Sequence, residues 1–128
     1  MKYLHTMIRV GELERSIRFY TEVLELVHHR TTDYPDGEFS LAFLGYGGDS
    51  EPFLELTYNY GVSEYEHGGA YGHMAFAVED IKAACDKITE LGGRVTRPPG
   101  PMKHGKTVLA FIEDPDGYKV ELIERGNP

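Results

Sequence analysis

The stretch VGEL at Val10–Leu13 recurs in related form as VEDI at Val78–Ile81, which gives an offset of 68 residues. The same offset superposes His5 on His73. It also superposes two apolar segments, Leu41–Leu44 (LAFL) and Leu109–Ile112 (LAFI). A repeat of about half the chain is too long for the short stacked units of a solenoid, so it predicts a duplicated supersecondary module.

Near the end of each half, Leu54–Leu56 matches Val120–Leu122 at an offset of 66 residues. The two-residue difference requires a length change in a loop, which loops tolerate. We expect a single domain over residues 1–128, made of a first module at 1–62 and a second at 69–128. The polar, glycine-bearing segment Gly61–Gly69 is the expected linker.

The first half predicts the order strand, helix, strand, strand, strand. Residues of two kinds alternate along the first strand: Leu4, Ile8 and Val10 on one face, and His5, Met7 and Arg9 on the other. An amphipathic helix follows, with an apolar stripe at steps of three and four: Leu13, Ile17, Tyr20, Leu24 and Val27. Three strands come next, separated by turn-forming residues, at roughly Val27–Thr32, Phe39–Leu44 and Phe53–Tyr58.

The second half predicts the same order. A strand at Gly72–Val78 precedes a helix at Ile81–Leu91, which Asp80 caps and the Gly92-Gly93 pair ends. Strands follow near Arg94–Arg97, Thr107–Ile112 and Tyr118–Glu124. The turn-forming sequence Asp114–Gly117 (DPDG) joins the last two. Each half is therefore a βαβββ module.

Composition restricts the function classes. The chain has 128 residues and 41% hydrophobic content, enough for a buried core. Its 13 basic and 21 acidic residues give a net charge of -8, which disfavours nucleic-acid or anionic-membrane partners and favours small-molecule ligands. No apolar run predicts a membrane span or a secretory leader, so we expect a cytoplasmic protein. The single cysteine, Cys85, shares a helical apolar stripe and is expected to be a packed thiol.

Four residues carry the predicted chemistry. His5 and Glu55 lie on the first and last strands of one module, and His73 and Glu121 occupy the equivalent places in the other. Both glutamates are flanked by apolar residues, so each is expected on the sheet face opposite the core, where a partner or a cation offsets the cost of burying charge. There are two alternatives to a metal site. A single histidine on a strand is more often a hydrogen-bonded surface or core residue, and common ancestry alone can preserve equivalent residues in a repeat. The duplicated pair nevertheless favours a metal site.

Two imidazoles and two carboxylates leave up to two positions of an octahedral ion for water or substrate oxygens. This ligand set suits nickel, cobalt, manganese, iron or zinc better than magnesium, and it indicates a catalytic site. The predicted fold class is thus α+β, with two βαβββ modules whose sheets curve around the metal. Small Ala75 and Ala77 on the His73 face leave room for a ligand.

Other polar residues allow two interpretations. Arg9 and Asn59 each lie four residues beyond a predicted ligand on the same strand face, where they could hold the far end of an anionic, peptide-like substrate. From the residues alone, an ordinary surface position is the simpler interpretation. The basic stretch Lys103–Lys106 is either an anion-binding cap or a solvated turn. Four histidines have no repeat partner: His28, His29, His67 and His104.

Five stretches together resemble one known family. They are Leu4–Val10 (LHTMIRV), Ser16–Tyr20 (SIRFY), Glu55–Asn59 (ELTYN), Tyr71–His73 (YGH) and Glu113–Leu122 (EDPDGYKVEL). The order and content of these stretches are similar to those of bacterial glyoxalase I (lactoylglutathione lyase), within the vicinal oxygen chelate superfamily. The resemblance covers essentially the whole chain.

The resemblance implies specific roles for residues. The metal ligands would be His5, Glu55, His73 and Glu121. Arg9 and Asn59 would contact the glutathione part of the substrate. With histidine at the first ligand position, the chain resembles the nickel- or cobalt-activated bacterial class. The resemblance therefore implies nickel as the metal, with cobalt possible and zinc poorly active. The family forms homodimers with sites at the subunit interface.

In one respect the chain differs from its implied family. Some relatives have an arginine four residues before the second histidine, where this chain has Gly69. Arg97 or the Lys103–Lys106 stretch is then expected to bind the glutathione carboxylate.

The implied reaction isomerises the hemithioacetal of methylglyoxal and glutathione to S-lactoylglutathione through an enediolate, a methylglyoxal detoxification. Glu121 would remove the proton from the sulfur-bearing carbon, and Glu55 would share the proton shuttling. Three rival functions are an extradiol dioxygenase, an antibiotic-sequestering module and a methylmalonyl-CoA epimerase. A fourth protein ligand disfavours the first, and the retained ligand set disfavours the second. Arg9 with Thr57–Asn59 favours glutathione over the third.

Overall fold

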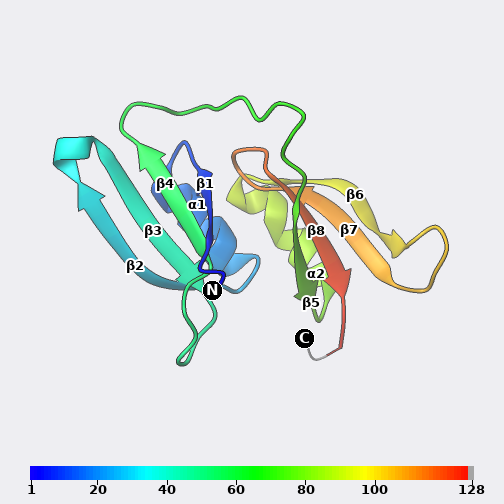
Figure 1. The fold of residues 1–128 in the computed structure, drawn as a ribbon. Helices are drawn as coiled ribbons and strands as arrows, with labels where there is room; N and C mark the ends of the chain where they lie inside the picture. The colour runs from blue at the N-terminus through cyan, green and yellow to red at the C-terminus, as the bar shows by residue number, and fades with distance from the viewer. Residues whose placement is uncertain (127–128) are drawn as a thin grey trace. The chain divides into compact units, whose positions relative to one another are not determined.

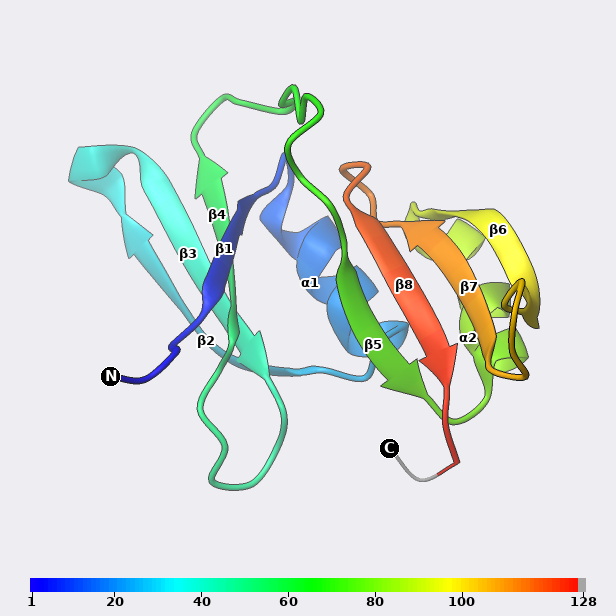
Figure 2. The same cartoon turned by 45° about the vertical axis from the view of Figure 1, so that its right-hand side comes forward.

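The computed structural model describes residues 1–126. It divides into two compact units, Met1–Glu66 and a second unit that begins at His67. The boundary falls within the segment expected to be the linker. Within residues 1–126, each unit contains one α-helix and one four-stranded sheet. The helix of each unit lies beside its own sheet, as Figure 1 and the turned view of Figure 2 show.

The first unit follows the predicted order of elements. Its elements are β1 (Thr6–Arg9), α1 (Leu13–Glu22), β2 (Val27–Tyr34), the 3-10 turn η1 (Pro35–Gly37), β3 (Phe39–Gly45) and β4 (Leu54–Asn59). The spatial order of the strands is β1-β4-β3-β2. Strand β1 pairs with β4 in parallel, because the chain crosses over through α1, and the other pairs are antiparallel.

The second unit repeats this topology. Its elements are β5 (Met74–Val78), α2 (Ile81–Ile88), the 3-10 turn η2 (Thr89–Leu91), β6 (Arg94–Pro101), β7 (Val108–Glu113) and β8 (Lys119–Glu124). The spatial order is β5-β8-β7-β6, and β5 pairs with β8 in parallel. The predicted α+β class with two βαβββ modules is confirmed. The sheets are open, not closed into barrels.

In the second half, the structure confirms the predicted helix cap, the helix end and the turn before the last strand. The Asp80 side chain accepts a hydrogen bond from the backbone N–H of Ala83 at 3.0 Å, as an N-cap does. Gly92 ends the helical segment with a φ of 90°, which glycine adopts without the steric cost of a Cβ. In the turn before β8, the backbone N–H of Gly117 donates to the carbonyl of Asp114 at 2.9 Å.

Two residues of the predicted apolar pattern lie elsewhere than expected. Leu4 is 61% exposed, because β1 begins only at Thr6. Val27 is 44% exposed, because α1 ends at Glu22 and Val27 opens the next strand. Glu25, with a φ of 58°, turns the chain between the two elements. Phe19, which the stripe omitted, is fully buried.

The core of each unit lies between its helix and one sheet face. Leu54 and Leu56 of β4, and Val120 and Leu122 of β8, are at most 1% exposed. Because side chains alternate along a strand, Glu55 and Glu121 between them face away from the core, as predicted. Within residues 1–126, no helix is long and apolar enough to cross a membrane.

Candidate functional site

The first unit brings together His5 and Glu55. Their Nε2 and Oε1 atoms are 3.6 Å apart, with the side chains 35% and 15% exposed. His5 lies one residue before β1, and in the parallel pairing Met7 lies opposite Glu55. Since residues two apart share a strand face, His5 and Glu55 lie on the same side of the sheet.

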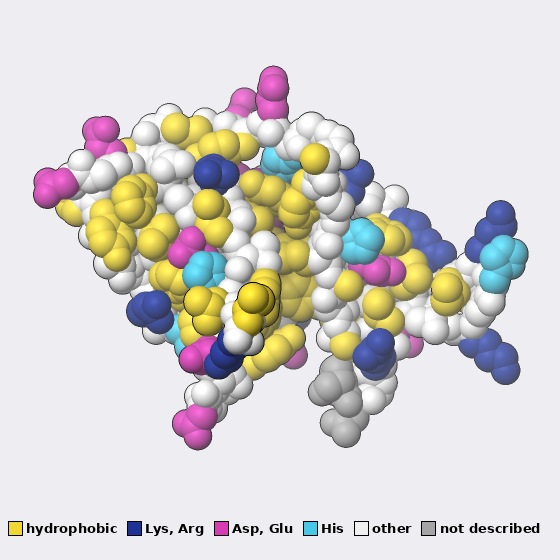
Figure 3. Space-filling view, in the orientation of Figure 1, with side chains coloured by type: hydrophobic (Ala, Val, Ile, Leu, Met, Phe, Trp, Pro, Cys, Tyr) yellow, Lys and Arg dark blue, Asp and Glu magenta, His cyan; other side chains and the backbone are white. Residues whose placement is uncertain are grey.

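The second unit brings together His73 and Glu121 in the same way. Their Nε2 and Oε1 atoms are 3.3 Å apart, with the side chains 42% and 18% exposed. His73 lies one residue before β5, and Ala75 lies opposite Glu121. The parallel pairing of the first and last strands therefore explains why a histidine and a glutamate far apart in sequence meet in each unit. Figure 3 shows histidine beside acidic side chains over each sheet, among hydrophobic ones.

A phenylalanine packs against each histidine. The rings of His5 and Phe43 meet edge to face with centroids 5.7 Å apart, and those of His73 and Phe111 at 5.5 Å. Phe43 lies directly opposite Glu55, and Phe111 opposite Glu121. Sequence reasoning gave these residues no role, although both occur in the repeated LAFL and LAFI segments. Their superposition by the repeat was the signal that could have identified them.

An arginine follows a register shift in the outer strand of each sheet. The shift between His28 and Arg30 brings the Arg30 guanidinium to 4.2 Å from the Phe43 ring centroid. The shift between Val95 and Arg97 brings Arg97 opposite Phe111. The Arg97 guanidinium donates to three backbone carbonyls, those of Gly100 (3.0 Å), Pro101 (2.9 Å) and Leu109 (2.6 Å). These bonds occupy Arg97 in holding β6 against β7, which leaves the carboxylate-binding role expected of it without support.

The geometry of each pair fits half of a metal site. Imidazole nitrogen and carboxylate oxygen bind divalent transition-metal ions at about 2.1 Å. Two ligand atoms at right angles around one ion therefore lie about 3.0 Å apart. Separations of 3.6 and 3.3 Å are close to that spacing. Within either unit, over residues 1–126, no group of three or more His, Cys, Asp or Glu residues could hold an ion. Each unit thus offers one nitrogen and one oxygen ligand, not a complete site.

The expected substrate-binding residues lie farther along the same two strands. Arg9 ends β1, opposite Thr57. Asn59 ends β4, and its amide donates to the Tyr65 hydroxyl at 3.0 Å. Thr57, on the Glu55 face, is 7% exposed, and its buried hydroxyl has no hydrogen-bond partner within the described part of the chain. An unpaired buried hydroxyl is costly, so this face is suited to a polar ligand.

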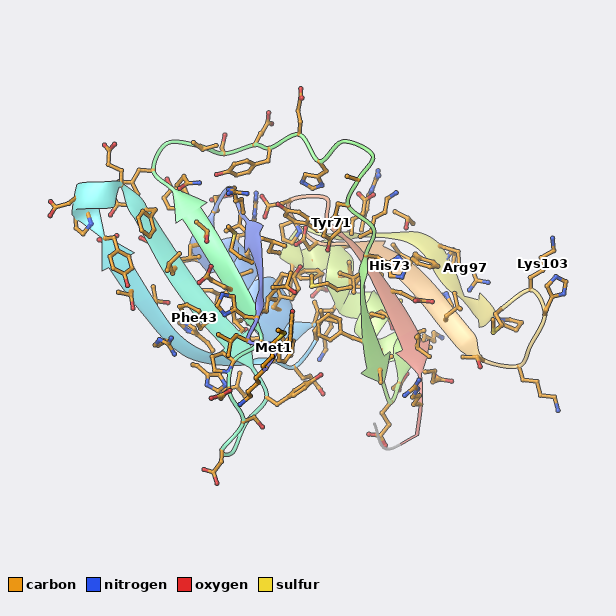
Figure 4. The ribbon with its side chains drawn as sticks, in the orientation of Figure 1. Met1, Phe43, Tyr71, His73, Arg97 and Lys103 are labelled. Atoms are coloured by element: carbon orange, nitrogen blue, oxygen red, sulfur yellow. The ribbon has the colours of Figure 1, made fainter. Side chains whose placement is uncertain are left out.

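The basic stretch and the cysteine lie away from the pairs. In Figure 4, Lys103 lies at the tip of the loop after β6, at the far end of the second unit from His73. His104 is exposed in the same loop. Burial raises the pKa of the Cys85 thiol, and the nearby Asp86 carboxylate raises it further. This state suits the packed thiol expected from the sequence, because a raised pKa keeps a thiol protonated and unreactive.

The fold and the two His–Glu pairs define a class of protein. The family model described as Glyoxalase/Bleomycin resistance protein/Dioxygenase superfamily matches residues 2–122. The chain therefore belongs to this superfamily.

Relatives narrow the assignment. The chain is 58% identical to the lactoylglutathione lyase of Escherichia coli O157:H7, over 97% of this chain and 93% of that protein. The crystal structure of glyoxalase I from Zea mays matches 98% of this chain with 46% identity and a TM-score of 0.89, and this chain spans 45% of the maize chain. The trypanothione-dependent glyoxalase I of Leishmania major matches 97% of this chain and 86% of its own, with 46% identity and a TM-score of 0.80. Within the superfamily, the chain belongs to the lactoylglutathione lyase (glyoxalase I) family.

Proposed function

We propose that this chain is a lactoylglutathione lyase that isomerises the hemithioacetal of methylglyoxal and glutathione to S-lactoylglutathione, and so detoxifies methylglyoxal. The observation that carries the proposal is the duplicated His–Glu pair on the open face of each sheet. It occurs in a chain 58% identical to a protein of that name. We place the enzyme in the cytoplasm.

The proposed ligands of one divalent ion are His5, Glu55, His73 and Glu121. Each unit supplies a nitrogen–oxygen pair of suitable spacing but no third ligand among its described residues, so a complete site requires one module of each kind. We propose a homodimer with sites at the subunit interface, where each site takes one module from each chain. The expected ion is Ni²⁺, with Co²⁺ possible and Zn²⁺ poorly active. When bound, the ion acts as a Lewis acid on the substrate oxygens.

The two carboxylates move the proton. Glu121 removes it from the carbon that bears sulfur, and the electron pair of that C–H bond enters the enediolate. The proton returns to the neighbouring carbon, and the hydroxyl proton of the first carbon passes to the former ketone oxygen, which leaves a hydroxyl there and the thioester carbonyl on the first carbon. No oxidant is needed, because one carbon is oxidised as the other is reduced. Glu55, at the equivalent position of the other module, shares the proton transfer, while His5 and His73 stay in place.

Arg9 and Asn59 bind the glutathione portion in this proposal. Arg9 supplies a positive charge for a carboxylate, and Asn59 supplies donors and an acceptor for peptide groups. Both lie at the far ends of their strands, away from the histidine end. This separation allows the thiol carrier to extend along the sheet while the reacting carbons stay at the His–Glu pairs.

The test is the initial rate of thioester formation on metal-stripped protein refilled separately with Ni²⁺, Co²⁺ or Zn²⁺. We expect high activity with nickel, lower with cobalt and little with zinc, and loss of activity on chelation. Glutathione and trypanothione should be compared as the thiol, because the Leishmania major relative depends on trypanothione. The proposal is wrong if the protein is inactive with both thiols and with all three metals. Epimerisation of methylmalonyl-CoA by the same protein would then identify the alternative function.

A further inference from the structure

Three aromatic rings connect the linker to the last turn of the second unit. The His67 ring stacks on the Tyr118 ring, with centroids 4.1 Å apart and planes at 16°. Tyr71 meets Tyr118 edge to face at 5.2 Å and His67 at 6.5 Å. We refer to His67, Tyr71 and Tyr118 as the aromatic clamp.

The clamp joins the two segments that carry the proposed ligands. Tyr71 lies two residues before His73, and Figure 4 shows both on the segment that leads into β5. Tyr118 lies three residues before Glu121, at the end of the turn that leads into β8. Contacts within the clamp therefore fix where the chain enters each ligand-bearing strand.

The turn side of the clamp is anchored by the protein's own hydrogen bonds. Tyr118 is 8% exposed, and its backbone N–H donates to the Asp114 carboxylate at 2.9 Å. The backbone N–H of Asp114 in turn donates to the Tyr118 carbonyl at 2.9 Å. Asp114 is itself 2% exposed and also accepts from the N–H of Asp116. Buried charge-assisted bonds of this kind make a turn rigid.

The linker side depends on ring packing. The Tyr71 hydroxyl is buried and has no hydrogen-bond partner among residues 1–126, so it does not orient the ring through a bond of its own. Residues 61–73 contain no helix or strand. Ring contacts with Tyr118 thus hold this approach to β5.

The first unit has no equivalent of the clamp. By the repeat offsets, Tyr3 corresponds to Tyr71, and Pro52 to Tyr118. Tyr3 is 69% exposed, and its hydroxyl bonds to Thr6 on its own segment. The clamp is therefore a difference between the two modules, and it cannot be explained by the duplication alone.

We propose that the aromatic clamp holds His73 and Glu121 in the geometry needed to share an ion. Within the clamp, His67 is the residue whose substitution tests this role. The proposal rests on the proposed function for its metal measurement. Among the described residues, the ring contacts of His67 are with Tyr71 and Tyr118, not with a proposed ligand. Its effect passes through the stacked ring of Tyr118 and the edge contact of Tyr71.

The experiment compares His67→Ala, His67→Phe and His28→Ala in the full chain. Phenylalanine keeps a planar ring that stacks on tyrosine. His28 is an exposed histidine on β2 whose hydrogen bond goes to Thr31, so its replacement controls for loss of an imidazole. The imidazole NMR signals of metal-free protein are the first readout. Ni²⁺ affinity and the visible spectrum of the Co²⁺ form are the second, because that spectrum depends on coordination geometry.

We expect His67→Ala to shift the His73 imidazole signals, leave those of His5 unchanged, alter the Co²⁺ spectrum and weaken Ni²⁺ binding about tenfold, as loss of outer support for a ligand does. His67→Phe and His28→Ala should match the parent protein. The proposal is wrong if His67→Ala leaves the His73 signals in place, or if His67→Phe behaves like His67→Ala. Failure of the parent protein to bind metal would reject the proposed function, whereas the NMR comparison would still decide the clamp.

Discussion

Replacing Glu121, the proposed base, with glutamine tests proton transfer separately from folding. The substitution keeps the size and shape of the side chain, and Glu121 is on the open face with 18% of its side chain exposed. Its neighbours Val120 and Leu122, both fully buried, keep their core contacts. We therefore expect the free energy of unfolding to change by less than about 1 kcal/mol. Loss of a general base should slow isomerisation by roughly 10²–10⁴-fold, which corresponds to about 3–5 kcal/mol in the barrier.

The assay is the isomerisation rate at saturating Ni²⁺, together with metal content and thermal unfolding. An amide oxygen can still bind a metal, so the rate must be compared at equal occupancy. Glu113→Gln is the matched control on β7, because the Glu113 side chain is 19% exposed, much as that of Glu121 is, and pairs with the exposed Arg94 at 3.0 Å. Glu55→Gln should reduce the rate less than Glu121→Gln. A near-normal rate in Glu121→Gln at full occupancy would refute Glu121 as the base.

Three further predictions concern stability. Asp114→Ala should destabilise the fold by about 2–4 kcal/mol in urea unfolding, because its buried carboxylate accepts two backbone N–H groups. In the same measurement, Leu122→Ala should cost about 2–5 kcal/mol and Leu4→Ala almost nothing, since Leu122 is fully buried and Leu4 exposed. The Tyr60 hydroxyl, and then Ser40, lower the pKa of Asp33. That contact should stabilise the fold above the unfolded-state pKa and be lost as pH falls through the lower folded value, so Asp33→Asn should flatten stability against pH in this range.

The order of helices and strands could be predicted because it depends on local sequence patterns, and these patterns occur in both halves of the chain. Alternation around Ile8 and Val10, the helical spacing of Ile17 and Tyr20, and the Asp80 cap each act over a few residues. Errors occurred where a pattern crossed an element boundary. Val27 continued the helical stripe by spacing, yet the chain had already turned at Glu25, and periodicity alone does not register such a turn.

Within the candidate site, the sequence could predict only the residues that the repeat pairs with one another. The offset identified His5 and His73 as equivalent, and the parallel pairing explains why each meets a glutamate. The register shifts before Arg30 and Arg97 gave no such signal, because they depend on how adjacent strands pair and carry no particular turn residue. The stacking of His67 on a turn about fifty residues later was equally hidden, since it is a contact of tertiary structure.

The sheet geometry also supports the proposal that two modules are needed for one metal site. Each glutamate lies between two cross-strand neighbours on its own face, Met7 and Phe43 for Glu55. In the second unit the corresponding neighbours are Ala75 and Phe111. All four neighbours lack the strong oxygen or nitrogen donors that such an ion binds, so neither sheet can add a third ligand beside its glutamate. Under the proposed function, one such module cannot complete a metal site by itself, and the duplication supplies a second His–Glu pair of similar spacing, 3.3 Å against 3.6 Å. The aromatic clamp distinguishes the two copies, which fits the proposal that Glu121 removes the proton while Glu55 shares in its transfer.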